Sequence, residues 1–368
     1  MNEKTQPCTH CGAVHPRVNL TWMGSAELCP ECLQRYTVCC DCCGERIWMA
    51  NDYGTHYLHL CASCRADNYV TCENCGALIP QEDAHYNDED EAYCDSCYER
   101  GYGGTIHNYS YKPEPIFYGD GPLYLGVELE VDEAGKDNIN AVQALRAFNQ
   151  ENVYGYVKSD GSLNDGFELV THPCTLETHL QQVPWRETLE ALRGMGYRSH
   201  APGTCGLHVH VSRKALGKDV YEQEETIAKL LYIFERIWQE ILRFSRRTES
   251  QINHWAARYG YKDRGEEILK EAKHGANGRY ACINPTNTDT IKFRVFRGTL
   301  KYNTVIATLQ FVANLCRVAT SLPEYRIQEF SWPALIEALM QDNCPELVQY
   351  LKERNLYVNE PVTAEREV

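Results

Sequence analysis

The sequence predicts an α+β protein in two parts, a small cysteine-rich part followed by a larger part built on a mainly antiparallel sheet. Fourteen of the 19 cysteines lie within the first 97 of the 368 residues. The rest of the chain alternates short β-like runs with longer helical patterns. Apolar and polar residues alternate within those runs, which favours a sheet whose one face is covered by helices.

Charge and hydropathy argue against two classes of partner. Lys plus Arg total 36 against 51 Asp plus Glu, a formal net charge of -15, whereas nucleic acids and anionic membranes attract clustered cations. No apolar run approaches the roughly 20 residues that cross a bilayer. The start, MNEKTQPCTH, lacks the pattern of a signal peptide. We therefore expect a cytoplasmic protein with no nucleic-acid or membrane partner.

The cysteines of residues 1–100 form an internal repeat. Three C-x-x-C pairs, each followed by glycine, begin 32 residues apart, and a second C-x-x-C pair answers each after 17 or 18 residues. Two turns that present four thiolates to one ion are the arrangement of structural zinc sites. We expect three structural zinc ions, in zinc-ribbon-like modules over about residues 8–32, 40–64 and 72–97. The predicted ligands are Cys8, Cys11, Cys29 and Cys32; Cys40, Cys43, Cys61 and Cys64; and Cys72, Cys75, Cys94 and Cys97.

Two further cysteines fall outside this repeat. In the run CCDCC, the register of the other modules selects Cys40 and Cys43 as ligands and leaves Cys39 and Cys42 as spares. Residues 1–100 carry 6 Lys or Arg and 16 Asp or Glu, so phosphate binding is not expected of them. Two roles stay open, recruitment of a protein or peptide substrate, and zinc as a replacement for a hydrophobic core.

The remainder of the chain divides by composition. Residues 101–122, rich in Gly, Pro and Tyr, are expected to form a linker, residues 123–358 the second domain and residues 359–368 a disordered tail. Strands are expected at LYLGVELEV, GFELVTH, GLHVHVS and TIKFRVFRG. Helices are expected over residues 174–195, 221–248, 301–320 and 333–354.

Polar residues at a spacing of two mark several of these strands, where such side chains share one face. Taken alone, each motif is typical of a solvent-facing strand, a turn or a surface ion pair. Carboxylates suit Mg²⁺ or Mn²⁺, and arginines suit the phosphate that those ions neutralise. The combination therefore predicts a magnesium-nucleotide site. Its members are Glu128, Glu130, Asp160, Ser162, Glu168, His208, His210, Lys292, Arg294 and Arg297.

The order of the motifs GVELEV, SDGSLNDGFELVTHP, CGLHVHVS and KFRVFRGTL resembles the amidoligase family over roughly residues 110–320. The resemblance implies a catalytic domain similar to those of glutamine synthetase and glutamate-cysteine ligase, with divalent ions on the concave face of a curved antiparallel sheet. It also implies an enzyme, an ATP-dependent carbon-nitrogen ligase that joins a carboxylate to an amine through an acyl phosphate. The carboxylate and the amine are then its partners, and recruitment by the zinc modules would apply to substrates carried by a protein or peptide.

The resemblance also assigns roles to individual residues. Arg294 and Arg297 match arginines expected on the ATP phosphates and the acyl phosphate, His210 would lie near those phosphates, and Asp160 and Ser162 would line the substrate side. The residues expected to bind Mg²⁺ or Mn²⁺ are Glu128, Glu130, Glu168 and His208.

Lys292 departs from the family pattern. The late strand of this superfamily often carries a carboxylate at that position, so one metal position is lost, moved or replaced by a cationic phosphate contact. Two other interpretations stay open. The same His and Glu residues could hold zinc or manganese in a metallohydrolase, or the fold could be degenerate and the zinc modules could serve a non-enzymatic adaptor.

Overall fold

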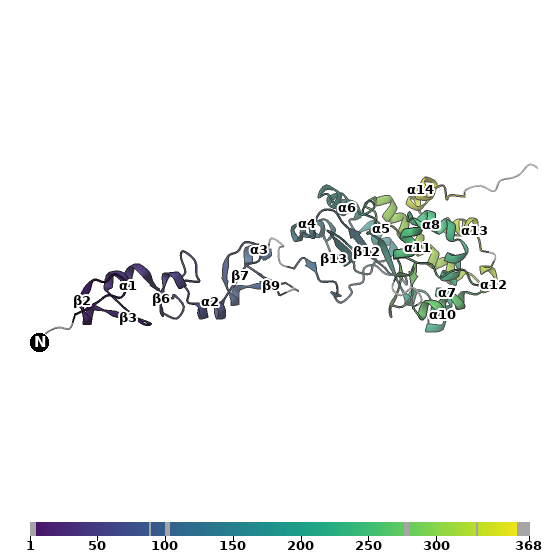
Figure 1. Ribbon diagram of the computed structural model, residues 1–368. Coiled ribbons are helices and arrows are strands. Elements are labelled where there is room, and N and C mark those ends of the chain that lie inside the picture. The colour runs from purple at the N-terminus through teal and green to yellow at the C-terminus, as the bar shows by residue number, and fades with distance from the viewer. Residues whose placement is uncertain (1–4, 88–89, 100–103, 276–279, 329, 359–368) are drawn as a thin grey trace, which may run out of the picture. The chain divides into compact units, whose positions relative to one another are not determined.

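The computed structural model describes residues 5–87, 90–99, 104–275, 280–328 and 330–358, and its elements are labelled in Figure 1. The chain forms two compact units, Met1–Gly104 and Thr105–Val368. The predicted disordered tail, residues 359–368, lies outside the described residues, as do residues 101–103 of the predicted linker.

The first unit repeats one order of elements, a short hairpin, a 3₁₀ turn and then a helix. The opening cysteine pair lies in the loop of each hairpin, where Gly12, Gly44 and Gly76 adopt positive φ values of 76°, 77° and 69°, as a tight turn favours. The elements are β1 (Thr5–Pro7), β2 (Val14–Pro16), η1 (Arg17–Asn19), β3 (Thr21–Met23), β4 (Ala26–Leu28), α1 (Pro30–Tyr36), β5 (Thr37–Cys39), β6 (Arg46–Trp48), η2 (Met49–Asn51), α2 (Ala62–Asn68), β7 (Tyr69–Thr71), β8 (Leu78–Pro80), η3 (Gln81–Asp83), β9 (His85–Tyr86), β10 (Ala92–Tyr93) and α3 (Asp95–Glu99).

Consecutive modules share apolar contacts. Helix α1 leads directly into β5, and α2 leads directly into β7. As a result Trp48 of β6 packs against the buried cysteines of the first module. Tyr69 and Leu78, from β7 and β8, pack in the same way against Cys40 and Cys61 of the second module. Each hairpin therefore completes the small core of the module before it.

The second unit is built on a seven-stranded sheet in the order β11-β13-β14-β12-β15-β17-β16. Only β11 and β13 pair in parallel, and the other neighbours are antiparallel. The predicted α+β class with a mainly antiparallel sheet is confirmed. The strands are β11 (Ile106–His107), β12 (Leu125–Val131), β13 (Gly155–Lys158), β14 (Phe167–Thr171), β15 (Leu207–Ser212), β16 (Ile283–Asn284) and β17 (Thr290–Phe293).

Three of the four predicted helices are wrong in their bounds. Pro184, which has no N–H to donate, separates α5 from α6; the helical conformation is interrupted at Ile237, between α7 and α8; and Pro345 opens α14 as a new helix. The helices are α4 (Asn138–Phe148), α5 (Leu176–Gln181), α6 (Trp185–Gly194), η4 (Arg213–Ala215), α7 (Val220–Arg236), α8 (Trp238–Ser245), α9 (Glu249–Trp255), α10 (Gly265–Lys273), α11 (Tyr302–Ser321), α12 (Glu324–Ile327), α13 (Trp332–Leu339) and α14 (Pro345–Glu353).

Strand alternation separates the core of the second unit from its polar face. Leu125, Val127, Leu129 and Val131 of β12 are all buried in the apolar core. Helix α11 contacts α5, α7, α13, α14 and β15, and lies at the centre of this unit (Figure 1). The side chains between those four residues of β12 therefore point to the other face. Among the described residues, no helix is both long and apolar enough to span a bilayer.

Buried His179 on α5 is expected to make the second unit sensitive to acid. Its Nε2 donates to the carbonyl oxygen of Leu125 at 3.1 Å, and its Nδ1 accepts the indole N–H of Trp185 at 3.3 Å. This pattern requires a neutral imidazole, and burial lowers the pKa of His179 to about 4. The unfolded chain takes up a proton near pH 6.5. The stabilisation is therefore complete above that pH and is lost as the pH falls toward 4.

Thermal unfolding of the wild type and of His179→Gln at pH 7 and pH 5 measures this effect. The advantage of the wild type should shrink by about 2 kcal/mol between the two pH values, because the glutamine does not titrate. An advantage that stays constant would show that His179 is not held neutral.

Candidate active site

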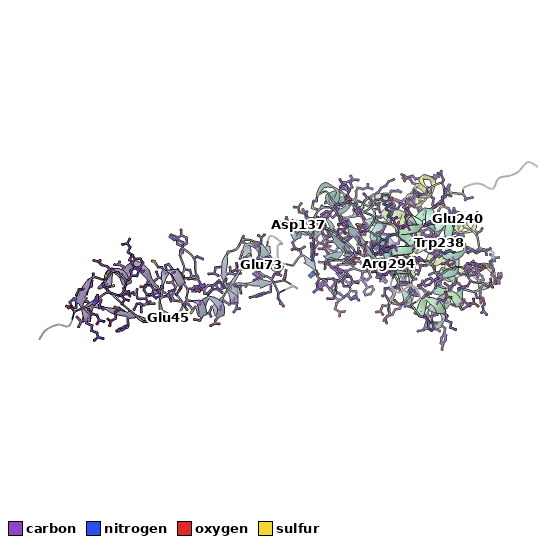
Figure 2. All side chains as sticks on the ribbon, viewed as in Figure 1. Glu45, Glu73, Asp137, Trp238, Glu240 and Arg294 are labelled. Carbon is purple, nitrogen blue, oxygen red and sulfur yellow. The ribbon has the colours of Figure 1, made fainter. Side chains whose placement is uncertain are left out.

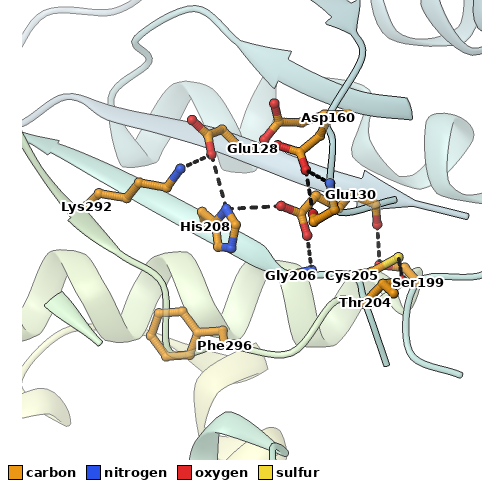
Figure 3. A network of polar contacts seen from close by, with 12 residues as sticks. Glu128, Glu130, Asp160, Ser199, Thr204, Cys205, Gly206, His208, Lys292 and Phe296 are labelled. Carbon is orange, nitrogen blue, oxygen red and sulfur yellow. Dashed lines mark hydrogen bonds and ion pairs between the residues drawn. The ribbon is translucent and has the colours of Figure 1, made fainter. Parts of the chain in front are cut away.

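The register of the sheet brings the predicted site residues onto one face. Cross-strand partners have neighbouring side chains, and the partners here come from four strands, β14, β12, β15 and β17. The pairs are Glu130 with Glu168, Glu128 with His208, and His210 with Lys292. Figure 3 shows Lys292 and His208 both pointing toward Glu128. These side chains lie on the face opposite the apolar residues of β12.

Two overlapping groups of possible ligand atoms meet on this face. Atoms of Glu128, Glu168 and His208 lie within 4.8 Å of one another, and so do atoms of Glu130, Asp160 and Glu168. Glu168 is common to both groups, so one carboxylate could bridge two cations. A donor set of carboxylate oxygens with one imidazole suits Mg²⁺ or Mn²⁺. Asp160, which the resemblance placed on the substrate side, here lies among the metal-ligand candidates.

Glu128 is surrounded by basic groups. His208 Nδ1 lies 3.1 Å and His210 Nε2 2.9 Å from its oxygens, and Lys292 Nζ makes an ion pair with it. Burial alone would raise the pKa of Glu128, but the charge of Lys292 and the two imidazoles hold that pKa well below its usual range. The ion pair of Lys292 with Glu128 places a cation against a candidate metal-ligand carboxylate. His210 also contacts Thr290 at 3.1 Å.

The other carboxylates are crowded and only partly compensated. Burial, and then the charge of Asp160, raise the pKa of Glu130 to about 7. Burial and repulsion by Glu128 and Glu130 raise the pKa of Glu168 well above its usual range, although Lys158 Nζ lies 3.5 Å away. Buried like charges of this kind are what a divalent cation neutralises. The residues present therefore fit a divalent metal.

His208 completes this donor set as a neutral base. It is 2% exposed, and burial followed by the charges of Lys292 and Arg294 lowers the pKa of its imidazole well below its usual range. Neutral imidazole is the form that binds metal ions. His208 is therefore held in the form that can serve as a ligand.

Asp132 anchors the loop that carries Asp160. Its carboxylate accepts the backbone N–H groups of Asn164 at 3.1 Å and of Asp165, and the hydroxyl of Thr204 at 3.0 Å. Asp132 itself is buried at the end of β12. The Asp160 loop is thus fixed to the strand that carries Glu128 and Glu130.

Asp160 and Ser162 form a turn beside a pocket. Asp160 Oδ1 accepts the backbone N–H of Ser162 at 2.8 Å and also its hydroxyl. A pocket of about 430 Å³, lined in part by Tyr109, Lys136 and Asp160, opens next to this turn. Ser162 does not line it. Asp160 is therefore the member of this pair that faces both the pocket and the carboxylate group.

The two predicted arginines keep unused donors. The guanidinium of Arg294 lies over the ring of Tyr280, 5.5 Å from its centroid. Its charge opposes the rise in the pKa of Glu130 and adds to the lowering of the pKa of His208. Figure 2 places Arg294 within the second unit. The backbone of Arg297 pairs with that of Gly206 in an isolated antiparallel β-bridge. Burial and then the positive charge of Arg297 lower the pKa of His200. In both arginines Nε is buried and has no hydrogen-bond partner among the described residues.

Three residues of the site were missed from the sequence. Lys158 belongs to a strand of four residues, too short for alternation to reveal it. Arg247 follows α8 inside a predicted helix, where arginine is usually a surface residue. The N–H of Gly206 donates to Glu130 (Figure 3), and a Cβ on Gly206 would lie 2.3 Å from His208 Nε2. Only glycine fits that contact.

Comparison with known proteins gives one family match, in the second unit. Residues 146–316 match the family model described as "Putative amidoligase enzyme". The matched segment contains Asp160, Glu168, His208 and Arg294, whereas Glu128 and Glu130 precede it. No curated protein matches this chain.

Two solved structures show weak similarity. A bifunctional glutathione synthetase from Pasteurella multocida is 14% identical, with a TM-score of 0.34, over 63% of this chain and 46% of that one. The complex between the prokaryotic ubiquitin-like protein Pup and its ligase PafA gives 9% identity and a TM-score of 0.30, over 64% of this chain and 62% of that one. The chain thus spans about half to three fifths of the lengths of these proteins.

Proposed function

We propose that the chain is an ATP-dependent ligase that joins a carboxylate to an amine through an acyl phosphate, and the match of residues 146–316 to the family model "Putative amidoligase enzyme" supports this. The product is an amide or isopeptide bond. One observation carries the proposal. Two buried carboxylates, Glu130 and Glu168, share a face with neutral His208, and Arg294 acts on this group with an unused donor.

The cation would be held by the two groups that share Glu168. The ligands are Glu128, Glu168 and His208 in one group, and Glu130, Asp160 and Glu168 in the other. A bound Mg²⁺ or Mn²⁺ would supply neutralisation of phosphate charge. His210 and Lys292 lie against Glu128 at the β15–β17 side of this face, where they can contact nucleotide phosphates.

The arginines serve the phosphoryl group. Arg294 and Arg297 would donate to its oxygens while the substrate carboxylate attacks the γ-phosphorus of ATP and ADP leaves. The amine then attacks the acyl carbon, and phosphate leaves as the amide forms. Asp160, at the pocket of about 430 Å³, can accept the proton that the amine loses. Glu130 and Glu168 are 3% and 2% exposed, so these two carboxylates are shielded from bulk water.

The first unit would recruit a protein or peptide substrate. Its net charge is acidic, with 6 Lys or Arg against 16 Asp or Glu over residues 1–100, and its four-cysteine clusters would each hold one structural zinc ion. Several large apolar side chains are exposed on it, among them Val18 at 84%, Trp22 at 60% and Tyr57 at 91%. These exposed apolar side chains support a role of the first unit in protein binding.

Calorimetric titration of ATP into the full chain tests this function without knowledge of the substrate. We expect binding that requires Mg²⁺ and that weakens at least tenfold in Arg294→Gln, because a charge-assisted contact to phosphate is lost. Arg243→Gln is the matched control, since Arg243 is exposed and donates to the carbonyl oxygens of Arg354 and Asn355.

Binding would justify a screen of carboxylates and amines for ADP release. If the folded, zinc-loaded protein binds no ATP with Mg²⁺, the ligase is contradicted. Metal-dependent hydrolysis without ATP would instead support a metallohydrolase.

A further inference from the structure

Two consecutive arginines after α8 differ sharply in their hydrogen bonds. Arg246, which adopts a positive φ of 66°, donates to the carbonyl oxygens of Gly298 at 3.2 Å and of Arg297, and lies 3.2 Å from His200 Nδ1. Its neighbour Arg247 is more buried, at 5% exposure. Arg246 is thus satisfied by the backbone that it supports.

Arg247 is not satisfied in that way. Among the described residues its side chain makes one long hydrogen bond, from a terminal nitrogen to the carbonyl oxygen of Phe296 at 3.3 Å. Its Nε and its other terminal nitrogen are buried and have no partner among the described residues. A buried donor without an acceptor is costly, and a buried cation more so. Such a side chain is kept where it serves a ligand.

Arg247 lies close to Gly206, where the absence of a Cβ leaves room for its guanidinium. A Cβ on Gly206 would lie 3.0 Å from a terminal nitrogen of Arg247 and 2.3 Å from His208 Nε2. The N–H of the same glycine donates to Glu130. Arg247 therefore reaches the polar face of the sheet near His208 and Glu130, which belong to different candidate metal groups.

The electrostatic surroundings of Arg247 are dominated by other cations. Burial lowers the pKa of Arg247 to about 10, Glu130 opposes this shift, and Arg294, Arg246 and Arg297 add to it. The side chain stays charged at neutral pH. Glu130, the acidic group that acts on it, is itself a metal-ligand candidate, so Arg247 has no dedicated anionic partner among the described residues.

We infer that Arg247 forms an oxyanion-binding site with Arg294 and Arg297, beside Glu130 and His208. A guanidinium presents its donors as a planar fork that matches phosphate or carboxylate oxygens. The ligand is thus an oxyanion, from either the nucleotide phosphates or the carboxylate substrate. The inference rests on the site of the proposed function and adds to it a residue that none of its motifs contains.

The first measurement is thermal unfolding of the full, zinc-loaded chain with and without inorganic phosphate. Phosphate should raise the melting temperature of the wild type by a few degrees and leave that of Arg247→Met almost unchanged. Without phosphate, Arg247→Met should melt at or above the wild-type temperature, because an uncompensated buried charge has been removed. Arg243→Met, at an exposed arginine with backbone acceptors, should keep the wild-type response to phosphate.

If Arg247 has only a structural role, the changes in melting temperature and in phosphate response should be reversed. Arg247→Met would then melt below the wild type without phosphate and keep its full phosphate response, which would overturn the inference. Arg247→Lys covers the case in which the methionine variant does not fold. It keeps the charge but not the fork, so its phosphate affinity should fall about tenfold, and an unchanged affinity overturns the inference as well.

Calorimetry with two ligands separates the sources of the oxyanion. Loss of affinity for ATP with Mg²⁺ in the Arg247 variants assigns the nucleotide phosphates. Unchanged affinity for ATP with Mg²⁺, together with loss of affinity for acetate as a simple carboxylate probe, assigns the carboxylate substrate. If Arg294→Gln loses ATP while Arg247→Met keeps every ligand, the inference fails and the ligase stands. If phosphate binding depends on Arg247 but ATP with Mg²⁺ does not bind, the oxyanion site stands and the ligase fails.

Discussion

Glu130→Gln is expected to lose tight Mn²⁺ binding and, at the same time, to stabilise the metal-free protein. Glu130 is 3% exposed and lies opposite Glu168 in the sheet register, and its ligand atom is within 4.8 Å of those of Asp160 and Glu168. Removing one of these charges removes repulsion that Lys158 and Arg294 offset only in part in the metal-free protein.

Glutamine keeps the shape of the side chain and can still accept the N–H of Gly206, so the fold should persist. The free energy of unfolding of the metal-free protein should rise by roughly 1–3 kcal/mol at pH 7. Affinity for Mn²⁺ should fall by about 100-fold or more, because loss of groups that merely support metal ligands already costs roughly 10- to 100-fold.

Mn²⁺ titration followed by electron paramagnetic resonance, with thermal unfolding in the presence of a chelator, measures both effects. Glu190→Gln supplies the control, since Glu190 is an exposed residue of α6. Gain of stability together with loss of metal is the signature of a ligand. Wild-type Mn²⁺ affinity in Glu130→Gln would show that this face is an ordinary buried ion-pair network.

The alternation of residues predicted the polar face well because it is a local property of each strand. Glu128 and Glu130 must share a face of β12, and His208 and His210 a face of β15, whatever else the chain does. The pairing of those strands depends on contacts between distant segments. The sequence therefore predicted which side chains point together, and the structure showed that Glu168 lies opposite Glu130.

The residues that escaped prediction come from elements without a pattern. Lys158 lies on a strand of four residues, and Arg247 lies in the loop after α8, at a place that is significant only because Gly206 lies beside it. The helix breaks at Pro184 and Pro345 could be predicted from the sequence, since proline disrupts a helix interior. The helical periodicity alone continues past both prolines and predicts helices that are too long. In the first unit the repeat predicted the three cysteine clusters, but not the packing of Trp48 on the module before it.

Cys61→Ser is expected to remove one zinc ion of three and to unfold the middle module. Cys61 belongs to the second cluster, with Cys40, Cys43 and Cys64, and it caps the N-terminus of α2. Zinc binding in such modules contributes roughly 10–16 kcal/mol of apparent free energy, which is folding free energy for so small a core.

The loss should spread beyond the mutated module. The buried cluster around Cys40, Leu60 and Cys61 also holds Tyr69 and Leu78 of the next hairpin, so those side chains lose their support. Limited proteolysis should therefore cut within residues 40–78 in the variant. The second unit has a separate apolar core, so binding of ATP with Mg²⁺ should not change.

Cys42→Ser is the control that makes the zinc count decisive. Cys42 lies one residue before a ligand in the same CCDCC run, but it is exposed and outside the cluster, and its sulfur accepts from Asn68 at 3.7 Å. Metal analysis of the full chain should give three zinc ions for the wild type and for Cys42→Ser, and two for Cys61→Ser. Both substitutions replace one thiol of the same module by a hydroxyl. A different zinc count in the two variants can therefore come only from the position of the cysteine in the repeat. An equal loss in both would mean that the 32-residue register does not select the ligands.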